Sequence, residues 1–523
     1  MKYLLAVLLP AFALCQQPLP EIVHQDGRYA LMVDGAPYLI LGAQVNNSSA
    51  WPALLPKVWP AIESLHANTV EMPVYWEQLE PKQGTFDFSV IDTLLSQSRE
   101  HHVHLVLLWF GTWKNGSGHY TPEWVKLNPV LYPRMLDAKG QPIDSLSPHA
   151  TATLEADTAA FCALLRHLKE TDAQRTVLMV QVENEPGTWG AVRDYSPAAE
   201  KLFQSQVPPK LLNALHSQAK GTWSEVFGAD AEEFFHAWSV ASFIGHVAAA
   251  GKAIYPLPLY TNAALRDPFN PGRPPRYESG GPTDNVLDIW KATAPALDLL
   301  GPDIYLNDRA RYEKVLDLYS RPDNALFVPE TGNSSFFAPY FFAALGHGAI
   351  GFAPFGMDYS GYSNAPLGAT RINDDVLAPF AANYQLIEPM SREIARLNFE
   401  GKLKAVTEEK GKPTQTLQFG PWQAQVTYGL PQFGFNRNPP GNAEPVGRAL
   451  VAQLAADEFL VAGFHCRVEF SSPGKKPQFL HVEEGVYQNG RFIPSRLWNG
   501  DQTDWGLNFT ATPQVLRVKV ATY

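Results

Sequence analysis

Cysteine, positive charge and long apolar runs are all scarce in this sequence. Only three of its 523 residues are cysteines, Cys15, Cys162 and Cys466, which is too few for the disulfide framework of a small secreted domain. Cys162 falls in a helical pattern and Cys466 in a strand pattern, and both positions favour buried free thiols. The chain therefore has to be stabilised by large apolar cores of its own.

The charge balance is acidic. The sequence has 41 Lys and Arg against 52 Asp and Glu, a net charge of -11, and this argues against a nucleic-acid partner because such partners require a basic surface. The balance suits a soluble protein that acts on a neutral substrate. The 13 Trp and 20 Tyr residues could line a sugar site, since aromatic faces stack on sugars. A large core explains the same numbers, so both interpretations stay open for any single aromatic residue.

The longest apolar run stands at the N-terminus. One positive charge precedes the apolar residues 4–14, a pattern typical of a secretory signal and too short to span a bilayer stably. We predict that residues 1–15 are a signal peptide cut near Gln16, and hence that the protein is periplasmic or secreted. Lipidation at Cys15 is the alternative, disfavoured by the large Leu14 before it. No other run is long and apolar enough to be a membrane span.

Strand patterns alternate with helix patterns between residue 38 and about residue 380. Phe161, Leu164, Leu165 and Leu168, for example, have the i, i+3, i+4, i+7 spacing of a helix with one buried face. Buried strands are predicted at residues 38–43, 68–72, 104–109, 178–185, 257–261, 297–305, 325–330 and 349–355. About eight strand-helix units predict an α/β protein with a (β/α)8 TIM barrel. We assign residues 16–398 to this barrel, including an N-terminal hairpin with an Asp34-Gly35 turn.

The pattern of predicted secondary structure changes at about residue 399, where short β-rich segments replace the helices. Asn489-Gly490 is a strong hairpin signal, and residues 515–520 alternate as in a half-buried strand. These features predict a C-terminal β-sandwich over residues 399–523. Carbohydrate binding, homo-oligomerisation and support of the barrel are all open as its role.

Two of the predicted strands end in a glutamate. One run ends in Asn184-Glu185-Pro186 and another in Pro329-Glu330. The chemistry of TIM barrels sits at the C-terminal ends of the strands, and glycosidases need two carboxyl groups, one as proton donor and one as nucleophile or base. A salt-bridged surface residue is the alternative for either glutamate alone, but the pair predicts catalysis.

These motifs resemble clan A of the retaining glycoside hydrolases. Trp76-Glu77-Gln78-Leu79-Glu80-Pro81, followed by residues 84–88, is similar to a signature of family 35 and family 42 β-galactosidases, and residues 301–305 are similar to their strand-six end. Residues 41–51 and 193–199 resemble one bacterial branch of family 35. That branch includes galactosidases associated with xyloglucan breakdown, and its members carry a β-rich C-terminal domain.

The resemblance implies a retaining exo-β-galactosidase. Such an enzyme would remove terminal β-D-galactosyl residues from plant-polysaccharide side chains, xyloglucan among them, or from their oligosaccharides. Glu185 would be the general acid/base and Glu330 the nucleophile, Asn184 would bind the sugar 2-hydroxyl, and Tyr305 would orient Glu330. Double displacement of this kind calls for no metal and no cofactor.

Three stretches depart from the family pattern. Gln44-Val45-Asn46 replaces the strand-one His-Tyr pair, Pro73 replaces a strand-two Tyr, and residues 111–115 replace the Ala-Glu pair after strand three. In the wider family these positions contact the 3-, 4- and 6-hydroxyls of galactose. The replacement contacts therefore decide which sugar is accepted.

We name five candidate residues for these contacts: Tyr75, Trp113, Lys114 and Asn115, with Phe355 at the end of strand eight as a stacking platform. Packing is the alternative role for each aromatic residue. Two other functions stay open as well. One is a different clan A exo-glycosidase, such as a β-glucosidase or an α-L-arabinopyranosidase. The other is a non-catalytic carbohydrate-binding barrel.

Overall fold

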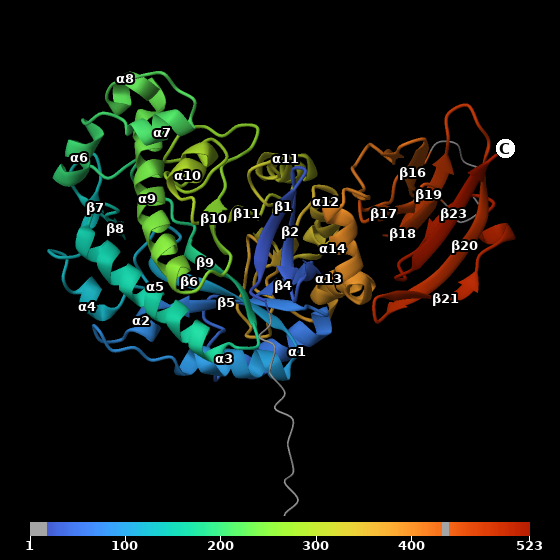
Figure 1. Cartoon of the computed structure of the whole chain (residues 1–523), viewed down its shortest axis with the longest axis horizontal. Coiled ribbons are helices and arrows are strands. Elements are labelled where there is room, and N and C mark those ends of the chain that lie inside the picture. The colour runs from blue at the N-terminus through green and yellow to red at the C-terminus, as the bar shows by residue number, and fades with distance from the viewer. Residues whose placement is uncertain (1–17, 431–438) are drawn as a thin grey trace, which may run out of the picture.

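The computed structural model describes residues 18–430 and 439–523, in which a barrel and a β-sandwich lie side by side (Figure 1). Eight parallel strands close the barrel in the order β10-β11-β12-β13-β4-β5-β6-β9. Their bounds are β4 Ile40–Gln44, β5 Thr69–Tyr75, β6 His104–Lys114, β9 Val177–Asn184, β10 Leu259–Ala264, β11 Leu299–Ile304, β12 Val328–Thr331 and β13 Gly351–Pro354. The predicted TIM barrel is confirmed, whereas the predicted signal peptide lies outside the described residues.

Helices follow the strands and surround the barrel. The main ones are α1 Leu55–Leu65, α3 Ser89–Glu100, α5 Thr151–Thr171, α9 Ala231–Ile254, α10 Leu287–Thr293, α11 Arg309–Tyr319, α12 Tyr340–Gly346 and α13 Asp374–Ile387. Phe161, Leu164, Leu165 and Leu168 of α5 are all fully buried, as their helical spacing predicts.

Long connections carry short elements of their own. They are α2 Trp76–Leu79 after β5; α4 Glu123–Lys126, β7 Arg134–Leu136 and β8 Pro142–Leu146 after β6; and α6 Pro197–Phe203, α7 Pro209–Ala214 and α8 Trp223–Phe227 after β9. The connections after β6 and β9 are thus the most elaborate parts of the barrel mouth, where an active site is expected.

The interior of the barrel is packed with side chains. Strands β1 Glu21–Gln25, β2 Arg28–Val33 and β3 Ala36–Tyr38 form a small antiparallel sheet before the barrel, with the predicted Asp34-Gly35 turn between β2 and β3. Leu31 and Val33 of β2 join one buried cluster with inward-facing residues of the barrel strands, including Val106, Leu178 and Phe327. The barrel is therefore a core rather than a pore, and polar chemistry is confined to its mouth.

The C-terminal β-sandwich has one six-stranded and one four-stranded antiparallel sheet among the described residues. The strands are β14 Leu403–Thr407, β15 Thr414–Phe419, β16 Trp422–Tyr428, β17 Arg448–Ala455, β18 Glu458–Phe464, β19 Cys466–Ser471, β20 Pro477–Gln488, β21 Arg491–Leu497, β22 Leu507–Phe509 and β23 Val515–Thr522. Asn489-Gly490 turns β20 into β21, as predicted.

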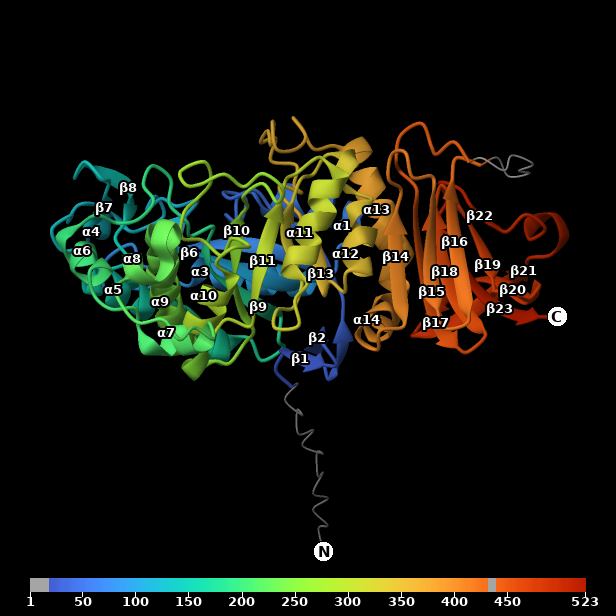
Figure 2. The ribbon, with the colours of Figure 1, turned by 90° about the horizontal axis from the view of Figure 1, so that it is seen from above.

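The β-sandwich shares apolar packing with the barrel. Helices α12, α13 and α14 (Ser391–Phe399) lie between the barrel strands and the β-sandwich (Figure 2). On β17, Ala449 and Val451 point into the β-sandwich, whereas Leu450 and Ala452 belong to the core that continues into the barrel. Both faces of this strand are thus buried, and the β-sandwich is a packed support of the barrel.

A buried arginine joins the two parts as well. Arg448 is 5% exposed, and its Nε donates to Oδ1 of Asn383 on α13 at 2.7 Å. Its guanidinium lies 4.0 Å from the ring centroid of Phe464. The positive charge is therefore neither solvated nor ion-paired by the contacts around it, and burial lowers the pKa of Arg448 to about 10.

Both cysteines of the described residues are free thiols. Cys466 is buried, and Cys162 is partly exposed. A search of the same residues for a helix long and apolar enough to cross a membrane finds none.

Candidate active site

Three carboxyl groups meet at the mouth of the barrel. Glu185 directly follows β9, Glu330 lies on β12, and Asp303 lies on β11 opposite Glu330 in the parallel register. One oxygen of each group lies within 4.8 Å of the others. Glu183 and Glu185 have positive φ angles of 63° and 41°, a conformation that residues with a side chain rarely adopt and that concentrates at functional sites. The structure thus brings together the two glutamates singled out in the sequence, and it adds Asp303.

Glu330 is held on both of its oxygens. The Tyr305 hydroxyl donates to Oε1, and Nε2 of Gln44 donates to Oε2 at 3.0 Å. Burial and the charge of Glu330 raise the pKa of Tyr305 well above its usual range, so its hydroxyl stays a donor. Two fixed donors leave the carboxylate, which is 5% exposed, in one orientation. The place of Tyr305 agrees with the sequence prediction, but the contact from Gln44 was not foreseen.

The pKa of Glu185 is raised into the neutral range. Burial first, and the nearby charge of Glu330 second, raise the pKa of Glu185 to about 7, while the charge of Lys114 opposes the rise. The backbone N–H of Glu185 donates to Oδ1 of Asn262 at 2.8 Å, which fixes the turn after β9. A carboxyl group with this pKa can donate a proton and later accept one.

Asp303 is the third carboxyl group of the cluster. It is 3% exposed, and its Oδ2 accepts from Nδ2 of Asn262 at 2.6 Å. Burial, and then the charges of Glu330 and Glu185, raise the pKa of Asp303 well above its usual range. Glu185, Asp303 and Glu330 are the described residues whose spacing could hold a metal ion. The raised pKa values of Glu185 and Asp303, beside a Glu330 that accepts two hydrogen bonds, suit the cluster to proton transfer.

The predicted residues Asn184, Lys114 and Asn115 also come together beside Glu185. Lys114 pairs with Asn184 in the register of β6 and β9. The Asn115 backbone N–H donates to the Asn184 carbonyl at 3.1 Å, and Lys114 Nζ donates to Asn115 Oδ1 at 2.6 Å. Asn184 and Lys114 are buried, whereas Asn115 is exposed. This arrangement places an ammonium group and two amides next to the proton donor.

The predicted sugar contact of Trp113 is wrong. Its indole is 1% exposed, packs against Phe243 of α9 with centroids 4.7 Å apart, and donates from Nε1 to Ser145 Oγ at 3.1 Å. Side chains alternate along a strand, so Lys114 and Trp113 at the end of β6 point in opposite directions. The Trp113 side chain therefore packs between the barrel strands and the surrounding helices.

Tyr75 and Phe355 both lie at the mouth. Tyr75 ends β5, is 5% exposed, and donates its hydroxyl proton to the carbonyl of Asn47 in the connection after β4. Phe355 follows β13, is partly exposed, and pairs with Gln44 in the barrel register. Phe355 is thus a neighbour of the residue that holds Glu330, and its role as a stacking platform stays a prediction.

A second carboxyl pair lies beside the first and is fully partnered. Glu183 accepts from the backbone N–H groups of Thr112 at 3.1 Å and Trp113 at 2.6 Å. Asp157 accepts from Trp109 Nε1 at 2.9 Å and from the Thr112 hydroxyl at 2.5 Å. Burial and the charge of Asp157 raise the pKa of Glu183 well above its usual range. The hydrogen bonds of this pair hold the C-terminal end of β6 in place.

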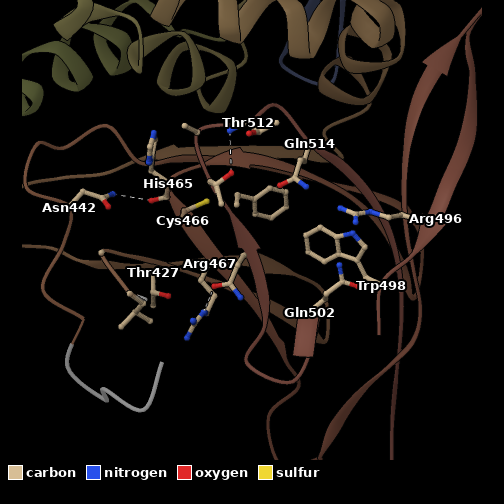
Figure 3. A pocket seen from close by; sticks show the side chains of 16 residues that line it. Thr427, Asn442, His465, Cys466, Arg467, Arg496, Trp498, Gln502, Thr512 and Gln514 are labelled. Atoms are coloured by element: carbon tan, nitrogen blue, oxygen red, sulfur yellow. Dashed lines mark hydrogen bonds between the residues drawn. The ribbon is translucent and has the colours of Figure 1, made fainter. Parts of the chain in front are cut away.

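A separate hollow of 490 Å³ lies in the β-sandwich (Figure 3). The described residues that line it include Arg467, Arg496 and Trp498. No Asp or Glu is found among these described lining residues. Glycoside hydrolysis requires paired carboxyl groups, so this hollow is not the candidate active site.

Comparisons with known proteins match two segments of the chain. Residues 55–234 match the family Glyco_hydro_42, described as beta-galactosidase, and residues 380–510 match DUF5597, a domain of unknown function. The first match is to family 42, so the finer prediction of a family 35 branch stays a prediction. A beta-galactosidase of Xanthomonas manihotis is 28% identical over 194 residues, which are 35% of this chain and 29% of that protein.

The comparison with solved structures matches two β-galactosidases. The enzyme from the psychrophilic Marinomonas ef1 superposes with a TM-score of 0.50 and 13% identity, over 68% of this chain and 61% of that one. The enzyme from Bacillus circulans sp. alkalophilus has a TM-score of 0.48 and 13% identity, over 68% and 57% of the two chains. The first likeness agrees with the barrel fold. The chain spans less than two thirds of each of these relatives.

Proposed function

We propose that this protein is a glycoside hydrolase, and specifically a retaining exo-β-galactosidase. The observation that carries the proposal is the spacing of Glu185 and Glu330, whose oxygens lie within 4.8 Å. Retaining enzymes hold their carboxyl groups about 5–5.5 Å apart, whereas inverting enzymes separate them by about 6.5–9.5 Å to admit a water molecule. The match to a beta-galactosidase family over residues 55–234 supports the choice of sugar.

In the first step, Glu330 attacks and Glu185 protonates. A Glu330 oxygen forms a bond to the anomeric carbon, while the bond from that carbon to the glycosidic oxygen breaks. Glu185, which is substantially protonated at neutral pH because its pKa is raised to about 7, gives its proton to the departing oxygen. Tyr305 and Gln44 keep the Glu330 carboxylate aimed throughout the attack. The products are a neutral alcohol and a glycosyl ester on Glu330.

The second step reverses the roles. Formation of the ester removes the charge of Glu330, which is the second-largest cause of the raised pKa of Glu185. The pKa of Glu185 therefore falls, and its carboxylate takes a proton from water as the water oxygen attacks the anomeric carbon. The bond from that carbon to Glu330 breaks, and galactose leaves with its original anomeric configuration.

The proposed substrate is a terminal β-D-galactosyl residue on a plant-polysaccharide side chain, xyloglucan included, or on its oligosaccharides. This choice rests on the motifs shared with the family 35 branch. A panel of nitrophenyl β-galactoside, β-glucoside and α-L-arabinopyranoside separates it from the other clan A activities. We expect the highest kcat/KM on the galactoside. Faster turnover of either of the other two glycosides would contradict the proposed sugar. Binding without turnover would instead support the alternative of a non-catalytic carbohydrate-binding barrel.

Glu330→Gly with added azide tests the nucleophile. We expect the variant to lose activity by about 10⁴-fold or more and to regain it when azide attacks the anomeric carbon in place of the carboxylate. Tyr312→Gly, in a residue that contacts β12 through Thr331 Oγ1, is the control for loss of packing, and azide is not expected to restore it. Full activity of Glu330→Gly without azide would contradict the assignment.

The proposal includes export through cleavage of residues 1–15. The mass of the protein recovered from the periplasm or the medium of the producing cell measures this. We expect a chain that starts near Gln16, whereas an uncut chain or a lipid on Cys15 would contradict it.

A further inference from the structure

Near the three carboxyl groups, the buried Glu278 has a side-chain oxygen without a hydrogen-bond partner among the described residues. Glu278 lies between β10 and α10 and is 2% exposed. Its Oε1 accepts from Nε1 of Trp189, whereas its Oε2 has no hydrogen-bond partner among the described residues. Leaving a buried polar atom unpaired is costly, and such atoms mark places where a ligand group can be held.

Trp189 is the exposed half of this pair. It lies four residues after Glu185, in the connection that follows β9, and its side chain is 51% exposed. Its indole N–H is fixed by Glu278, so the ring is held in one place although it is open to solvent. A large aromatic face held in this way is suited to stack on the apolar face of a sugar ring.

Backbone hydrogen bonds and close packing hold Glu278 and Trp189 at the barrel mouth. The backbones of Thr188 and Ser279 exchange two hydrogen bonds, of 2.8 and 3.1 Å, and so join the connections after β9 and β10. Gly187, two residues after Glu185, packs directly on Glu278: a Cβ at Gly187 would lie 2.6 Å from the Glu278 Cβ. Any larger residue would push these two connections apart.

The charges around Glu278 place it on the proton donor's side of the mouth. Burial first, and then the charge of Glu185, raise the pKa of Glu278 well above its usual range, and the charge of Lys114 opposes the rise. The protonated form of Glu278 is therefore favoured, and in that form Oε1 accepts from Trp189 while a hydroxyl at Oε2 is free to donate. The proton donor is the group that faces the departing oxygen in glycoside hydrolysis.

We propose that Glu278 and Trp189 form a subsite for the sugar ring of the leaving group. In this subsite Oε2 of Glu278 donates to one hydroxyl of that ring, and the Trp189 indole stacks on its face. The inference rests on the proposed function, because it assigns the leaving-group side of the same candidate active site. It adds a preference for leaving groups that are themselves sugars.

A matched pair elsewhere in the chain has no free atom. In the β-sandwich, Glu484 Oε2 accepts from Trp498 Nε1 at 2.7 Å and from Arg496 Nε at 2.6 Å. Its Oε1 accepts from Gln514 Nε2 at 3.2 Å. The same two residue types are thus used there only for structure, and Glu484→Leu is the matched control.

The test compares two substrates with unactivated alcohol leaving groups, a β-galactosyl disaccharide and methyl β-galactoside. Only the first has a sugar as its leaving group. We expect Glu278→Leu and Trp189→Ala each to lower the ratio of kcat/KM for the disaccharide to kcat/KM for the methyl galactoside by about tenfold, the value of one hydrogen bond or one stacking contact. Glu484→Leu should leave this ratio at its wild-type value.

Glu278→Gln is the conservative variant. Its amide oxygen can accept from Trp189 and its NH2 group can donate in place of the hydroxyl, so we expect the ratio to stay within about threefold of wild type. An unchanged ratio in Glu278→Leu and Trp189→Ala would overturn the subsite. If the ratio falls as far in Glu278→Gln as in Glu278→Leu, the donor role of Oε2 is overturned. If the wild-type protein hydrolyses neither galactoside, the proposed function fails rather than the subsite.

Discussion

Glu183 and Glu185 are two residues apart on the same chain turn, yet their surroundings differ completely. Both oxygens of Glu183 accept backbone N–H groups, and the side chain is fully buried. Glu185 is partly exposed and faces Glu330 and Asp303. Burial raises the pKa of both. A raised pKa alone therefore does not mark a catalytic group, whereas a raised pKa in a partly exposed carboxyl group that faces a second carboxyl group at the barrel mouth points to one.

Replacing each of the two glutamates in turn is the strongest test of the difference between them. We expect Glu185→Gln to lower kcat/KM on methyl β-galactoside by about 10³-fold, because general acid catalysis contributes about 10²–10⁴-fold. Glu183→Gln places an amide NH2 near backbone N–H donors, so we expect about 1–3 kcal/mol of lost stability and a kcat far above that of Glu185→Gln. Thermal unfolding and initial rates measure the two effects. Equal losses of kcat would contradict the distinction.

The hydrogen bond to the nucleophile gives the next largest effect. Tyr305→Phe removes one of the two donors on Glu330, and a hydrogen bond to a charged group is worth about 1.5–3 kcal/mol, so kcat/KM should fall by about 10–100-fold. Tyr312→Phe is the matched control, since the Tyr312 hydroxyl contacts Thr331, the residue after Glu330, at 3.1 Å. A larger rate loss in the control would show that packing, not orientation of Glu330, is at stake.

The pH profile sharpens the role of Glu185. Since its pKa is about 7 and the protonated form is required, kcat/KM should fall by about tenfold per pH unit above pH 7. Lys114→Met removes a charge that lowers this pKa and should shift the descending limb to higher pH. A limb that moves to lower pH in this variant would contradict the assignment.

The smallest expected effect concerns a partnered charge far from the mouth. Arg448→Met leaves Asn383 Oδ1 without its donor, which should cost about 1–3 kcal/mol of stability. Because Arg448 lies in the contact between β-sandwich and barrel, Tm should fall while kcat of the folded protein is kept. Loss of kcat at an unchanged Tm would show that the β-sandwich acts on the chemistry directly.

Most of the fold could be predicted from the sequence, because helical and strand periodicities are local. The eight barrel strands, the hairpin turn at Asp34-Gly35 and the Asn489-Gly490 turn all lie where the patterns indicate. Glu185 and Glu330 could be found in the same way, since each ends an apolar run that forms a barrel strand.

Apart from Tyr305, which the family resemblance implied, the partners of these glutamates could not be predicted, because they depend on contacts across the barrel. Gln44 reaches Glu330 from a strand 286 residues away in sequence. Asp303 falls within the family-like residues 301–305, but nothing local indicates that its side chain joins the two glutamates, and Glu278 is a single acid without a local signal of its role. Trp113 is the opposite case, since strand alternation next to Lys114 could have indicated that only one of the two side chains faces the mouth.

Trapping the covalent intermediate tests the central claim most directly. A 2-deoxy-2-fluoro-β-galactoside with a good leaving group slows the second step more than the first, so the glycosyl ester should accumulate. We expect the intact mass to rise by one fluorogalactosyl group, and the modified peptide to carry it on Glu330. A label on Glu185, or galactose released with inverted configuration and no covalent adduct, would contradict the account.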